Sequence, residues 1–396
     1  MRRRAGLILA IVVAGSLIAA TVAIASGMRS PIPGIGGGGG AGGPIKAAAA
    51  LAYEPGAGAT GVNPTSSVSV RVSGGTFADV ALHDTTGKAV NGVLSNDRTR
   101  WTSYGRLAYG ERYTWSGTAN GENGNSVPLD SSFNTVVPAH QLRGLLNIGD
   151  GKTVGVAAPI EIQFDGHVAD RAAVERTLSV QASTPVEGAW GWLPDENGGS
   201  RIHYRTKAYW PANTKVTVAA KLFGVDYGGG SFGRADISST FTVGRAQVVK
   251  ADANSHRLVV MRDGQQAANY PASYGLASDP ERNTRSGIHV VNEKFTDKRM
   301  VSQQYNYDEV EKWAVRMSNN GEFIHANPDT TGVQGSSNVT HGCINLSTDN
   351  AKAYYDTAIY GDPVEVSGTP IKLSARDGDL WDWTLSWDQW TALSAV

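Results

Sequence analysis

The chemistry of this chain is concentrated around a single cysteine. Cys343 is the only cysteine in 396 residues, and it lies in the run Thr-His-Gly-Cys-Ile-Asn at 340–345. A second histidine, His325, precedes this run in the segment Phe-Ile-His-Ala at 323–326. The thiolate is the reactive form of cysteine, and a nearby imidazole or imidazolium favours it. The pattern therefore predicts a cysteine nucleophile assisted by a histidine.

Acyl transfer is the reaction that these residue types fit. Cys343 would attack a carbonyl carbon to form a thioester, while an imidazole takes the thiol proton and later activates the acceptor. Backbone N–H groups beside Gly342 would stabilise the oxyanion, a contribution of ~3 kcal/mol per donor. The residues alone do not distinguish His325 from His341 as the base.

Two further interpretations of the same segment are weaker. His325, His341 and Cys343 could be three zinc ligands, but no Asp, Glu or further Cys recurs at ligand spacing. A lone cysteine is also often a small buried hydrophobe. Here its neighbours are glycine and histidine instead of the Val, Ile or Leu that flank a core position. We therefore favour the nucleophile.

The composition and the N-terminus describe an exported protein. The formal net charge is −1, so no basic field indicates nucleic acid binding. Arginines at 2–4 precede an apolar run at 5–25 that is long enough to span a bilayer. Small residues at 23–25 also suit signal-peptide cleavage, but we favour a retained membrane anchor at 1–26. A flexible tether rich in glycine and proline follows at 27–48.

Residues 49–138 and 139–245 resemble two copies of one β-module. In each copy a turn signal precedes a run of alternating apolar and polar residues, at 68–72 in the first and 160–164 in the second. Such alternation is typical of half-buried strands. Each copy also closes with a strand rich in Ser and Thr. The pattern predicts tandem immunoglobulin-like sandwiches and a mainly β fold.

Aromatic residues and histidines of these modules carry no functional pattern. The aromatic residues could line a glycan-binding face, but sandwich cores explain them better. They are Tyr104, Tyr109, Trp190, Trp192, Tyr204 and Trp210. The histidines share no metal-ligand spacing and are predicted to be surface or packing residues. They are His83, His140, His167 and His203.

The third region, 246–368, is predicted to be β-rich with two helices. A strand at 257–261 runs into a turn at 262–265. One helix is expected at about 307–317, where Asp308 and Glu309 suit a helix N-terminus. A second is expected at 349–357, capped by Ser347 or Thr348, before a turn and a strand at 364–366.

The C-terminal extension, 369–396, is dense in tryptophan. Four tryptophans lie close together, namely Trp381, Trp383, Trp387 and Trp390. Such a cluster has to be covered, and packing against the preceding domain is the simplest way to cover it. A role at a membrane interface is less favoured.

The segment around Cys343 resembles the signature of the L,D-transpeptidases, cysteine enzymes that cross-link bacterial peptidoglycan. That signature is a histidine, a gap of intermediate length, and then Ser/Thr-His-Gly-Cys-x-Asn, which matches His325 and residues 340–345. The layout is similar to the actinobacterial and mycobacterial type, with an anchor, two immunoglobulin-like modules, a catalytic β-domain and a tryptophan-rich extension. The resemblance covers nearly the whole exported chain.

This resemblance implies a role for each matching position in the catalytic centre. Cys343 would be the nucleophile, and His325 the general base. The backbone carbonyl of Ala326 would complete the triad. Relatives often have Ser at this position, so a hydroxyl contact is missing here. The backbone of His341, Gly342 and Cys343 would form the oxyanion hole.

The substrate pocket is implied in the same way. The family has a lid loop with one Met and two Tyr, and Met300, Tyr305 and Tyr307 stand at the matching places. The lid is shorter between the two tyrosines than in relatives, which bears on the width of the channel. Ordinary packing would explain these three residues equally well. Thr340 and Asn345 would shape the pocket.

The implied reaction joins two peptidoglycan stem peptides. The donor is a tetrapeptide that loses D-Ala, and the acceptor is the side-chain amine of diaminopimelate in another stem, which gives a 3→3 cross-link. Water as acceptor would make the protein an L,D-carboxypeptidase. The resemblance also implies carbapenem β-lactams as covalent inhibitors and no metal or organic cofactor. Two competing hypotheses are a different cell-surface cysteine acyltransferase and a wall-binding scaffold with a vestigial catalytic domain.

Overall fold

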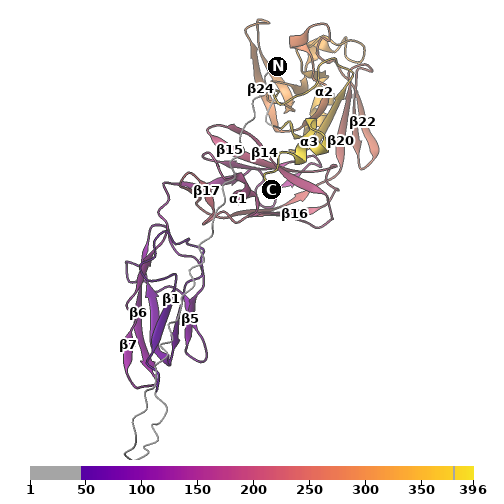
Figure 1. The fold of residues 1–396 in the computed structure, drawn as a ribbon. Helices are drawn as coiled ribbons and strands as arrows, with labels where there is room; N and C mark the ends of the chain where they lie inside the picture. Colours follow the sequence, from indigo (N-terminus) through magenta and orange to yellow (C-terminus); the bar gives the residue numbers. More distant parts are fainter. Residues whose placement is uncertain (1–45, 378–379) are drawn as a thin grey trace, which may run out of the picture. The chain divides into compact units, whose positions relative to one another are not determined.

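The computed structural model describes residues 46–377 and 380–396, and strands dominate this part of the chain (Figure 1). The predicted mainly β fold is confirmed, because the α-helices in this part are short. The predicted anchor at 1–26 and nearly all of the tether at 27–48 lie outside the described residues. Within the described residues no helix is long and apolar enough to cross a membrane.

The first module is a sandwich of two antiparallel sheets. Val68, Val70 and Val72 are buried in its core, as the alternation at 68–72 predicted. One sheet has the order β1(Ala50–Glu54)-β2(Ser69–Ser73)-β5(Arg100–Ser103)-β4(Gly92–Leu94). The other has the order β3(Gly75–His83)-β6(Arg112–Gly121)-β7(Ser126–Pro128), and β8(Ser132–Asn134) also pairs with β6.

The second module repeats this architecture around a larger core. Four of the aromatic residues discussed above, Trp190, Trp192, Tyr204 and Trp210, belong to that core, whereas Tyr104 of the first module is exposed. One sheet has the order β10(Gly144–Leu146)-β12(Ile160–Phe164)-β15(Gly199–Thr206)-β14(Gly188–Glu196). The second has the order β11(Thr153–Val154)-β19(Ile237–Val243)-β16(Lys215–Ala220)-β13(Leu178–Ala182). A small sheet, β17(Asp226–Gly228)-β18(Ser231–Gly233)-β9(His140–Leu142), and helix α1(Arg171–Glu175) complete the module.

The third region contains two sheets that share one apolar core. The larger sheet has the order β22(Gln265–Pro271)-β21(Arg257–Arg262)-β20(Gln247–Asp252)-β28(Pro363–Ser367)-β23(Gly287–Val290). The smaller has the order β24(Glu293–Ser302)-β25(Tyr307–Arg316)-β26(Phe323–Ala326)-β27(Ile344–Leu346). The predicted strands at 257–261 and 364–366 are therefore confirmed. Ile324 and Ile344, both fully buried, attach the smaller sheet to the core.

One of the two predicted helices is correct and the other is wrong. Helix α2(Thr348–Thr357) follows the cysteine, and the Ser347 side chain caps it by accepting a hydrogen bond from the backbone N–H of Asn350. Residues 307–316, by contrast, form strand β25, which pairs with β24 along its length. Pairing with a neighbouring strand outweighs local helix propensity, which is only a weak preference.

The tryptophan-rich segment packs against the second module. It contains a 3-10 helix, η3(Asp382–Thr384), and helix α3(Trp387–Thr391), which lies beside β14 in Figure 1. Trp390 is 0% exposed, and its Nε1 donates to the carbonyl oxygen of Ala189 in β14 at 3.0 Å. The prediction that the tryptophans are covered is confirmed. The covering surface is shared: Trp390 packs on the second module, whereas η3 also contacts β23(Gly287–Val290) of the preceding region.

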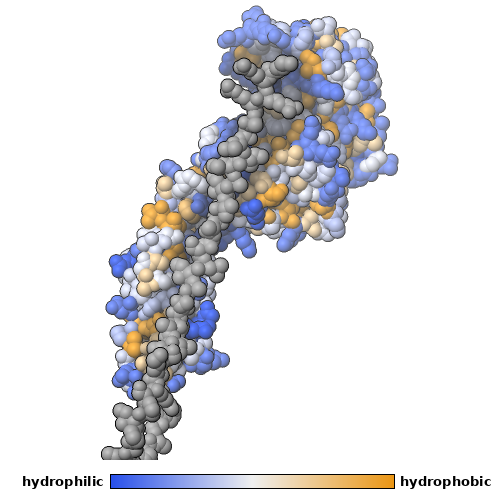
Figure 2. Space-filling view, viewed as in Figure 1, coloured by the Kyte–Doolittle hydropathy of each residue, from blue (hydrophilic) through white to orange (hydrophobic). Residues whose placement is uncertain are grey.

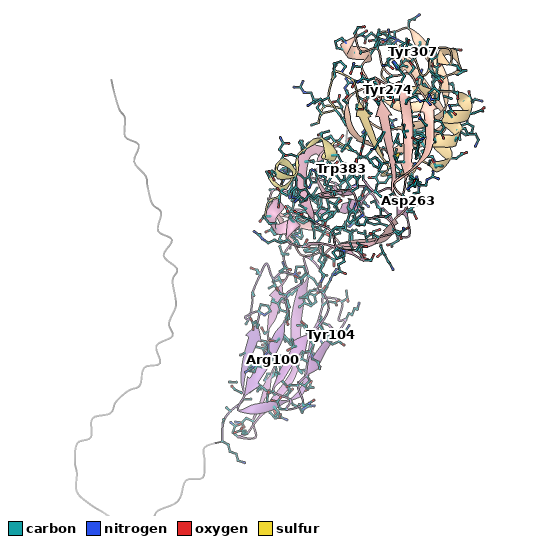
Figure 3. The ribbon with its side chains drawn as sticks, turned by 90° about the vertical axis from the view of Figure 1, so that its right-hand side faces the viewer. Arg100, Tyr104, Asp263, Tyr274, Tyr307 and Trp383 are labelled. Carbon is teal, nitrogen blue, oxygen red and sulfur yellow. The ribbon has the colours of Figure 1, made fainter. Side chains whose placement is uncertain are left out.

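Polar contacts reinforce this packing. The Arg205 guanidinium carbon lies 4.8 Å from the ring centroid of Trp383, which is labelled in Figure 3. Trp383 Nε1 also donates to the carbonyl oxygen of Ala157 at 2.9 Å. His203 and Asp382 form an ion pair with 2.8 Å between Nδ1 and Oδ1, and their side chains are 0% and 1% exposed. His203 is therefore a packing residue, and the extension is fixed to the second module by buried charges as well as by apolar surface.

Candidate active site

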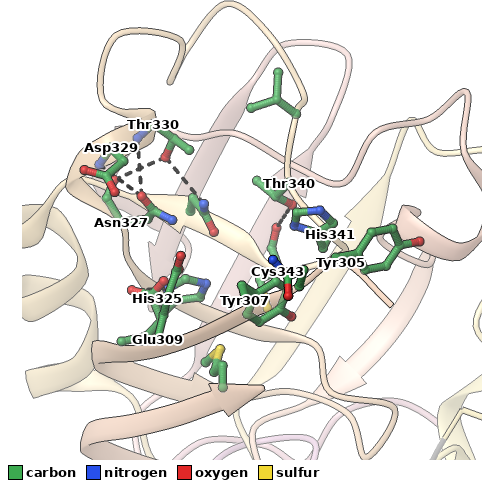
Figure 4. A pocket seen from close by; sticks show the side chains of 15 residues that line it. Tyr305, Tyr307, Glu309, His325, Asn327, Asp329, Thr330, Thr340, His341 and Cys343 are labelled. Atoms are coloured by element: carbon green, nitrogen blue, oxygen red, sulfur yellow. Dashed lines mark hydrogen bonds and ion pairs between the residues drawn. The ribbon is translucent and has the colours of Figure 1, made fainter. Parts of the chain in front are cut away.

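Parallel pairing of two short strands brings the predicted nucleophile and base to one place. β26 pairs with β27 so that His325 lies opposite Asn345. Cys343 comes two positions before Asn345, and side chains two positions apart along an extended chain point to the same side. Cys343, His325 and Asn345 accordingly all line the cavity drawn in Figure 4.

His325 is held through its Nδ1 atom. The residue is 3% exposed, and Nδ1 donates to the backbone carbonyl oxygen of Ala326 at 2.9 Å. The contact expected between these two residues is thus present, although Ala326 has no side-chain hydroxyl. Because Nδ1 is engaged, Nε2 is the nitrogen that is left to exchange a proton with a thiol.

Glu311 adds a carboxylate to this pair. Its Oε2 lies 3.3 Å from Nδ1 of His325, and its side chain is 12% exposed. Burial of the imidazole opposes its protonation, but hydrogen bonds with Cys343 and Glu311 and the charges of these groups outweigh burial and raise the pKa of His325 to about 10. At neutral pH this ring is therefore an imidazolium in the cavity that also holds the sulfur.

A hydrogen-bonded turn fixes the position of the cysteine. Thr340 Oγ1 donates to the carbonyl oxygen of Cys343 at 2.6 Å and accepts from the N–H of Gly342 at 3.3 Å. Thr284 Oγ1 donates to the carbonyl oxygen of Gly342 at 2.8 Å. Gly342 has a φ of +116°, a conformation that residues with a side chain rarely adopt. Thr340 therefore shapes the turn as well as lining the cavity.

The backbone N–H groups of this turn are not equivalent as oxyanion donors. Gly342 N–H already donates to Thr340 Oγ1. Within the described residues, the N–H groups of His341 and Cys343 donate no hydrogen bond. These two groups are the donors available to an oxyanion that forms next to the sulfur.

The lid residues surround His341 with aromatic rings. Met300, Tyr305 and Tyr307, brought by the β24–β25 hairpin, all line the cavity. The ring centroids of Tyr305 and Tyr307 lie 4.4 and 5.4 Å from that of His341. Burial and the positive charge of Arg282 lower the pKa of His341, so this imidazole is neutral at neutral pH. The residue types alone did not distinguish the two histidines. In the structure the pKa of His325 is raised and that of His341 is lowered.

Several polar residues of this cavity were not predicted from the sequence. They are Asn306, Glu309, Glu311, Asn327, Asp329 and Thr330. The signal for two of them was present, because Tyr307, Glu309 and Glu311 alternate with period two. That spacing places side chains on one face of a strand, but the helix assigned to this segment obscured it.

The ligand set considered for zinc is not assembled. Among the described residues, no three His, Cys, Asp or Glu side chains are arranged so that they could hold a metal ion. His325 is instead engaged by Ala326 and Glu311, and His341 by the two tyrosines.

Two protein-family models match this chain, and together they span most of its described part. A model described as a bacterial Ig domain matches residues 59–226. A model described as the L,D-transpeptidase catalytic domain matches residues 246–366, which include both β26 and β27.

Individual relatives extend this similarity over both regions. L,D-transpeptidase 5 of Mycobacterium tuberculosis is 50% identical over 347 residues, which cover 87% of this chain and 77% of that protein. L,D-transpeptidase 2 of the same species is 37% identical over 347 residues, covering 85% of this chain and 83% of that protein. The structure of LD transpeptidase LdtMt1 in complex with imipenem aligns over its whole length with 58% of this chain, at 29% identity and a TM-score of 0.49.

Proposed function

The chain belongs to the L,D-transpeptidase family, and we propose that it cross-links peptidoglycan stem peptides through a thioester on Cys343. The observation that carries this mechanism is that the only thiol shares a cavity with a buried imidazole whose Nδ1 is fixed by the Ala326 carbonyl oxygen. This arrangement supports a nucleophile with its acid and base already in place.

Acylation comes first. Sγ of Cys343 attacks the carbonyl carbon between diaminopimelate and D-Ala of the donor tetrapeptide. The N–H groups of His341 and Cys343 donate to the oxyanion that forms. As the C–N bond breaks, the imidazolium of His325 gives its proton to the leaving nitrogen. The products are free D-Ala, a thioester on Cys343 and a neutral imidazole.

Transfer to the acceptor reverses the proton movement. The neutral side-chain amine of diaminopimelate in a second stem attacks the thioester carbon. His325, now neutral, takes the proton that the attacking nitrogen loses. The C–S bond then breaks, and the new amide leaves behind a thiolate beside an imidazolium, as at the start. No metal or organic cofactor takes part in this scheme.

We propose that Glu311 keeps His325 protonated, which makes it a positioning residue. Glu311→Gln retains the shape but removes the charge, so acylation by a carbapenem at pH 7 is expected to fall about tenfold. The alkaline limb of the pH–rate profile, where His325 loses its proton, is expected to move to lower pH, a change that a purely structural defect would not produce. Asp297→Asn, an exposed acid on β24, is the matched control. An unchanged profile in Glu311→Gln would refute this role.

The proposed layout follows the family. We propose an anchor at 1–26, a tether at 27–48, immunoglobulin-like modules at 49–138 and 139–245, the catalytic domain at 246–368 and the extension at 369–396. The family acts on peptidoglycan, so the catalytic domain works outside the cytoplasm. The tether and modules would then hold the active site at a distance from the membrane.

The test is incubation of the purified full chain, in detergent, with a disaccharide-tetrapeptide. We expect a protein adduct at Cys343 that lacks D-Ala, followed by a cross-linked dimer, both measured by mass spectrometry. A carbapenem is expected to acylate the same residue. Tripeptide without dimer would indicate an L,D-carboxypeptidase. A protein that forms neither adduct nor product would be a scaffold, and the proposed function would be wrong.

A further inference from the structure

Each N–H group available to the oxyanion belongs to a peptide group whose carbonyl oxygen accepts a hydrogen bond from a side chain. The N–H of His341 shares a planar peptide with the carbonyl of Thr340, and the N–H of Cys343 shares one with the carbonyl of Gly342. In a trans peptide the N–H and the C=O point in nearly opposite directions. A group that fixes the carbonyl oxygen therefore also sets the direction of the N–H.

Arg282 contacts the first of these peptides. It ends the 3-10 helix η1(Pro280–Arg282), and its Nε donates to the carbonyl oxygen of Thr340 at 3.2 Å. A terminal nitrogen of the same guanidinium donates to the carbonyl oxygen of Val339. The guanidinium carbon also lies 5.9 Å from the ring centroid of Tyr305. Arg282 forms no ion pair with a described residue, so these two backbone carbonyls are the partners of its charge.

Backbone hydrogen bonds already place this part of the turn. The N–H of Leu276 donates to the same Thr340 oxygen at 3.2 Å, and the N–H of Thr340 donates to the carbonyl oxygen of Tyr274 at 3.0 Å. Arg282 therefore adds a positive charge at an oxygen whose position is set without it. A hydrogen bond from a charged donor is roughly twice as strong as one between neutral groups.

Thr284 contacts the second peptide. Its side chain is 0% exposed, and its Oγ1 accepts from the N–H of Gly275 and donates to the carbonyl oxygen of Gly342, both at 2.8 Å. Within the described part of the chain, no other group donates to that oxygen. The orientation of the Cys343 N–H therefore depends on this hydroxyl.

A donor on the carbonyl oxygen also strengthens the N–H of the same peptide. Hydrogen bonds in a chain polarise one another, by about 10–30% per bond. One oxyanion donor contributes a factor of about 10²–10³ to the rate, so polarisation of this size corresponds to a roughly two- to eightfold change. Burial and the positive charge of Arg282 lower the pKa of His341, which shows that this charge acts at the turn.

We propose that Arg282 and Thr284 are positioning residues of the oxyanion hole. Each donates to the carbonyl end of one peptide, and this bond orients and polarises the N–H that the peptide presents to the oxyanion. Neither side chain lines the cavity drawn in Figure 4, so both act through the backbone of the turn. The assignment rests on the proposed function, because it takes the reaction to be acylation of Cys343 through a tetrahedral oxyanion.

Two reactions of one sulfur distinguish this role from a general effect on the fold. Carbapenem acylation adds Sγ to a carbonyl carbon and passes through an oxyanion. Alkylation by iodoacetamide displaces iodide at a saturated carbon and forms no oxyanion. Cys343 is the only cysteine in the chain, so both adducts report on the same thiol. The rates are measured on the purified full chain in detergent by mass spectrometry, and their ratio is the result.

Both substitutions are expected to slow acylation selectively. Arg282→Met should lower the rate of carbapenem acylation about fivefold, and Thr284→Val about tenfold, with alkylation within about twofold of the native rate. Thr284→Val has the larger effect because the Gly342 oxygen then has no donor among the described residues. Thr284→Ser retains the hydroxyl and should restore the native ratio, and Arg282→Lys retains the charge and should restore part of it.

The matched controls are Arg376→Met and Thr296→Val. Both make the same kind of replacement at an exposed position that does not line the cavity. Thr296 lies on β24, around which hydrophilic residues predominate on the surface in Figure 2. Both controls should keep the native rates of acylation and alkylation.

The outcomes separate this inference from the proposed function. An equal fall of acylation and alkylation in Arg282→Met and Thr284→Val would show an effect on the thiol or the fold, and would overturn the inference. Native rates of acylation in both variants would overturn it as well, and a selective loss in only one would remove the role of the other residue. If the native chain is alkylated but is acylated neither by a carbapenem nor by the tetrapeptide, the proposed function itself fails.

Discussion

His325→Gln is expected to slow acylation of Cys343 about 10³-fold at neutral pH, within the range that general acid–base groups contribute. In the native protein Cys343 and Glu311 raise the pKa of His325 to about 10, so the imidazolium persists and the acylation rate should be nearly constant from about pH 6 to about pH 9. In the variant the thiol has to ionise without that imidazolium. Its acylation rate should therefore rise with pH instead of staying constant.

The measurement is the rate of carbapenem adduct formation across this pH range, followed by mass spectrometry. His341→Gln is the matched control, because its ring is neutral and packs on Tyr305 and Tyr307. The control should keep the flat profile, even if its absolute rate changes. A flat profile in His325→Gln, or a steep one in both variants, would show that His325 is not the partner of the thiol.

Asp382→Ala is expected to lower the free energy of unfolding by about 3–5 kcal/mol. Asp382 is buried, and its Oδ1 lies 2.8 Å from Nδ1 of His203, which is also buried. Removing the carboxylate leaves the imidazolium with only the more distant Glu161, whose Oε2 lies 3.7 Å from Nε2 of His203, and opens space beneath η3. Urea unfolding followed by tryptophan fluorescence suits the measurement, because this segment carries four tryptophans. Asp388→Ala, an exposed acid in α3, is the control and should change stability by no more than about 0.5 kcal/mol.

The same ion pair predicts the sign of a pH dependence. Burial opposes protonation of His203, but the charge of Asp382 and the hydrogen bond to it prevail and raise its pKa. Because the folded-state pKa is raised, the stabilisation is fully present below the unfolded-state value of ~6.5 and is lost as the pH rises through the folded-state pKa. The difference in stability between native protein and Asp382→Asn should therefore be largest below pH ~6.5 and shrink as the pH rises through the folded-state pKa. A constant difference would contradict this contribution.

The sequence determined the reaction class and most of the β framework. Cys343 and His325 are recognisable because acyl transfer needs a thiol, an imidazole and small residues at a tight turn, and these occur within one short stretch. Alternation is a local property, so Val68, Val70 and Val72 could be assigned to a buried strand face without any tertiary information. The cap of α2 is local in the same way, because the Ser347 side chain accepts a hydrogen bond from Asn350, only three residues further along the chain.

The helix predicted at 307–317 is wrong because its structure is decided by pairing with β24 and not by the local sequence. Acidic residues at its start favour a helix N-terminus, but that preference is small beside the hydrogen bonds and packing that β24 offers along the whole strand. Because of this error, the acidic side of the cavity was not predicted either. Tyr307, Glu309 and Glu311 face one cavity only because the segment is extended, and an assigned helix would have spread them around its axis.

Only the tertiary structure decided which groups surround the thiol. The register of β26 and β27 sets His325 opposite Asn345, and β25 brings Glu311 to the far side of the same ring. The tertiary structure also decided that Trp390 is buried on β14 of the second module. Each of these contacts joins residues far apart in the chain, so it depends on strand pairing and core packing that no local pattern records. The sequence by itself therefore indicated a thiol with two histidines and, through the family resemblance, His325 as the base. The fold decided that Glu311 and Asn345 lie beside His325, because that depends on strand pairing.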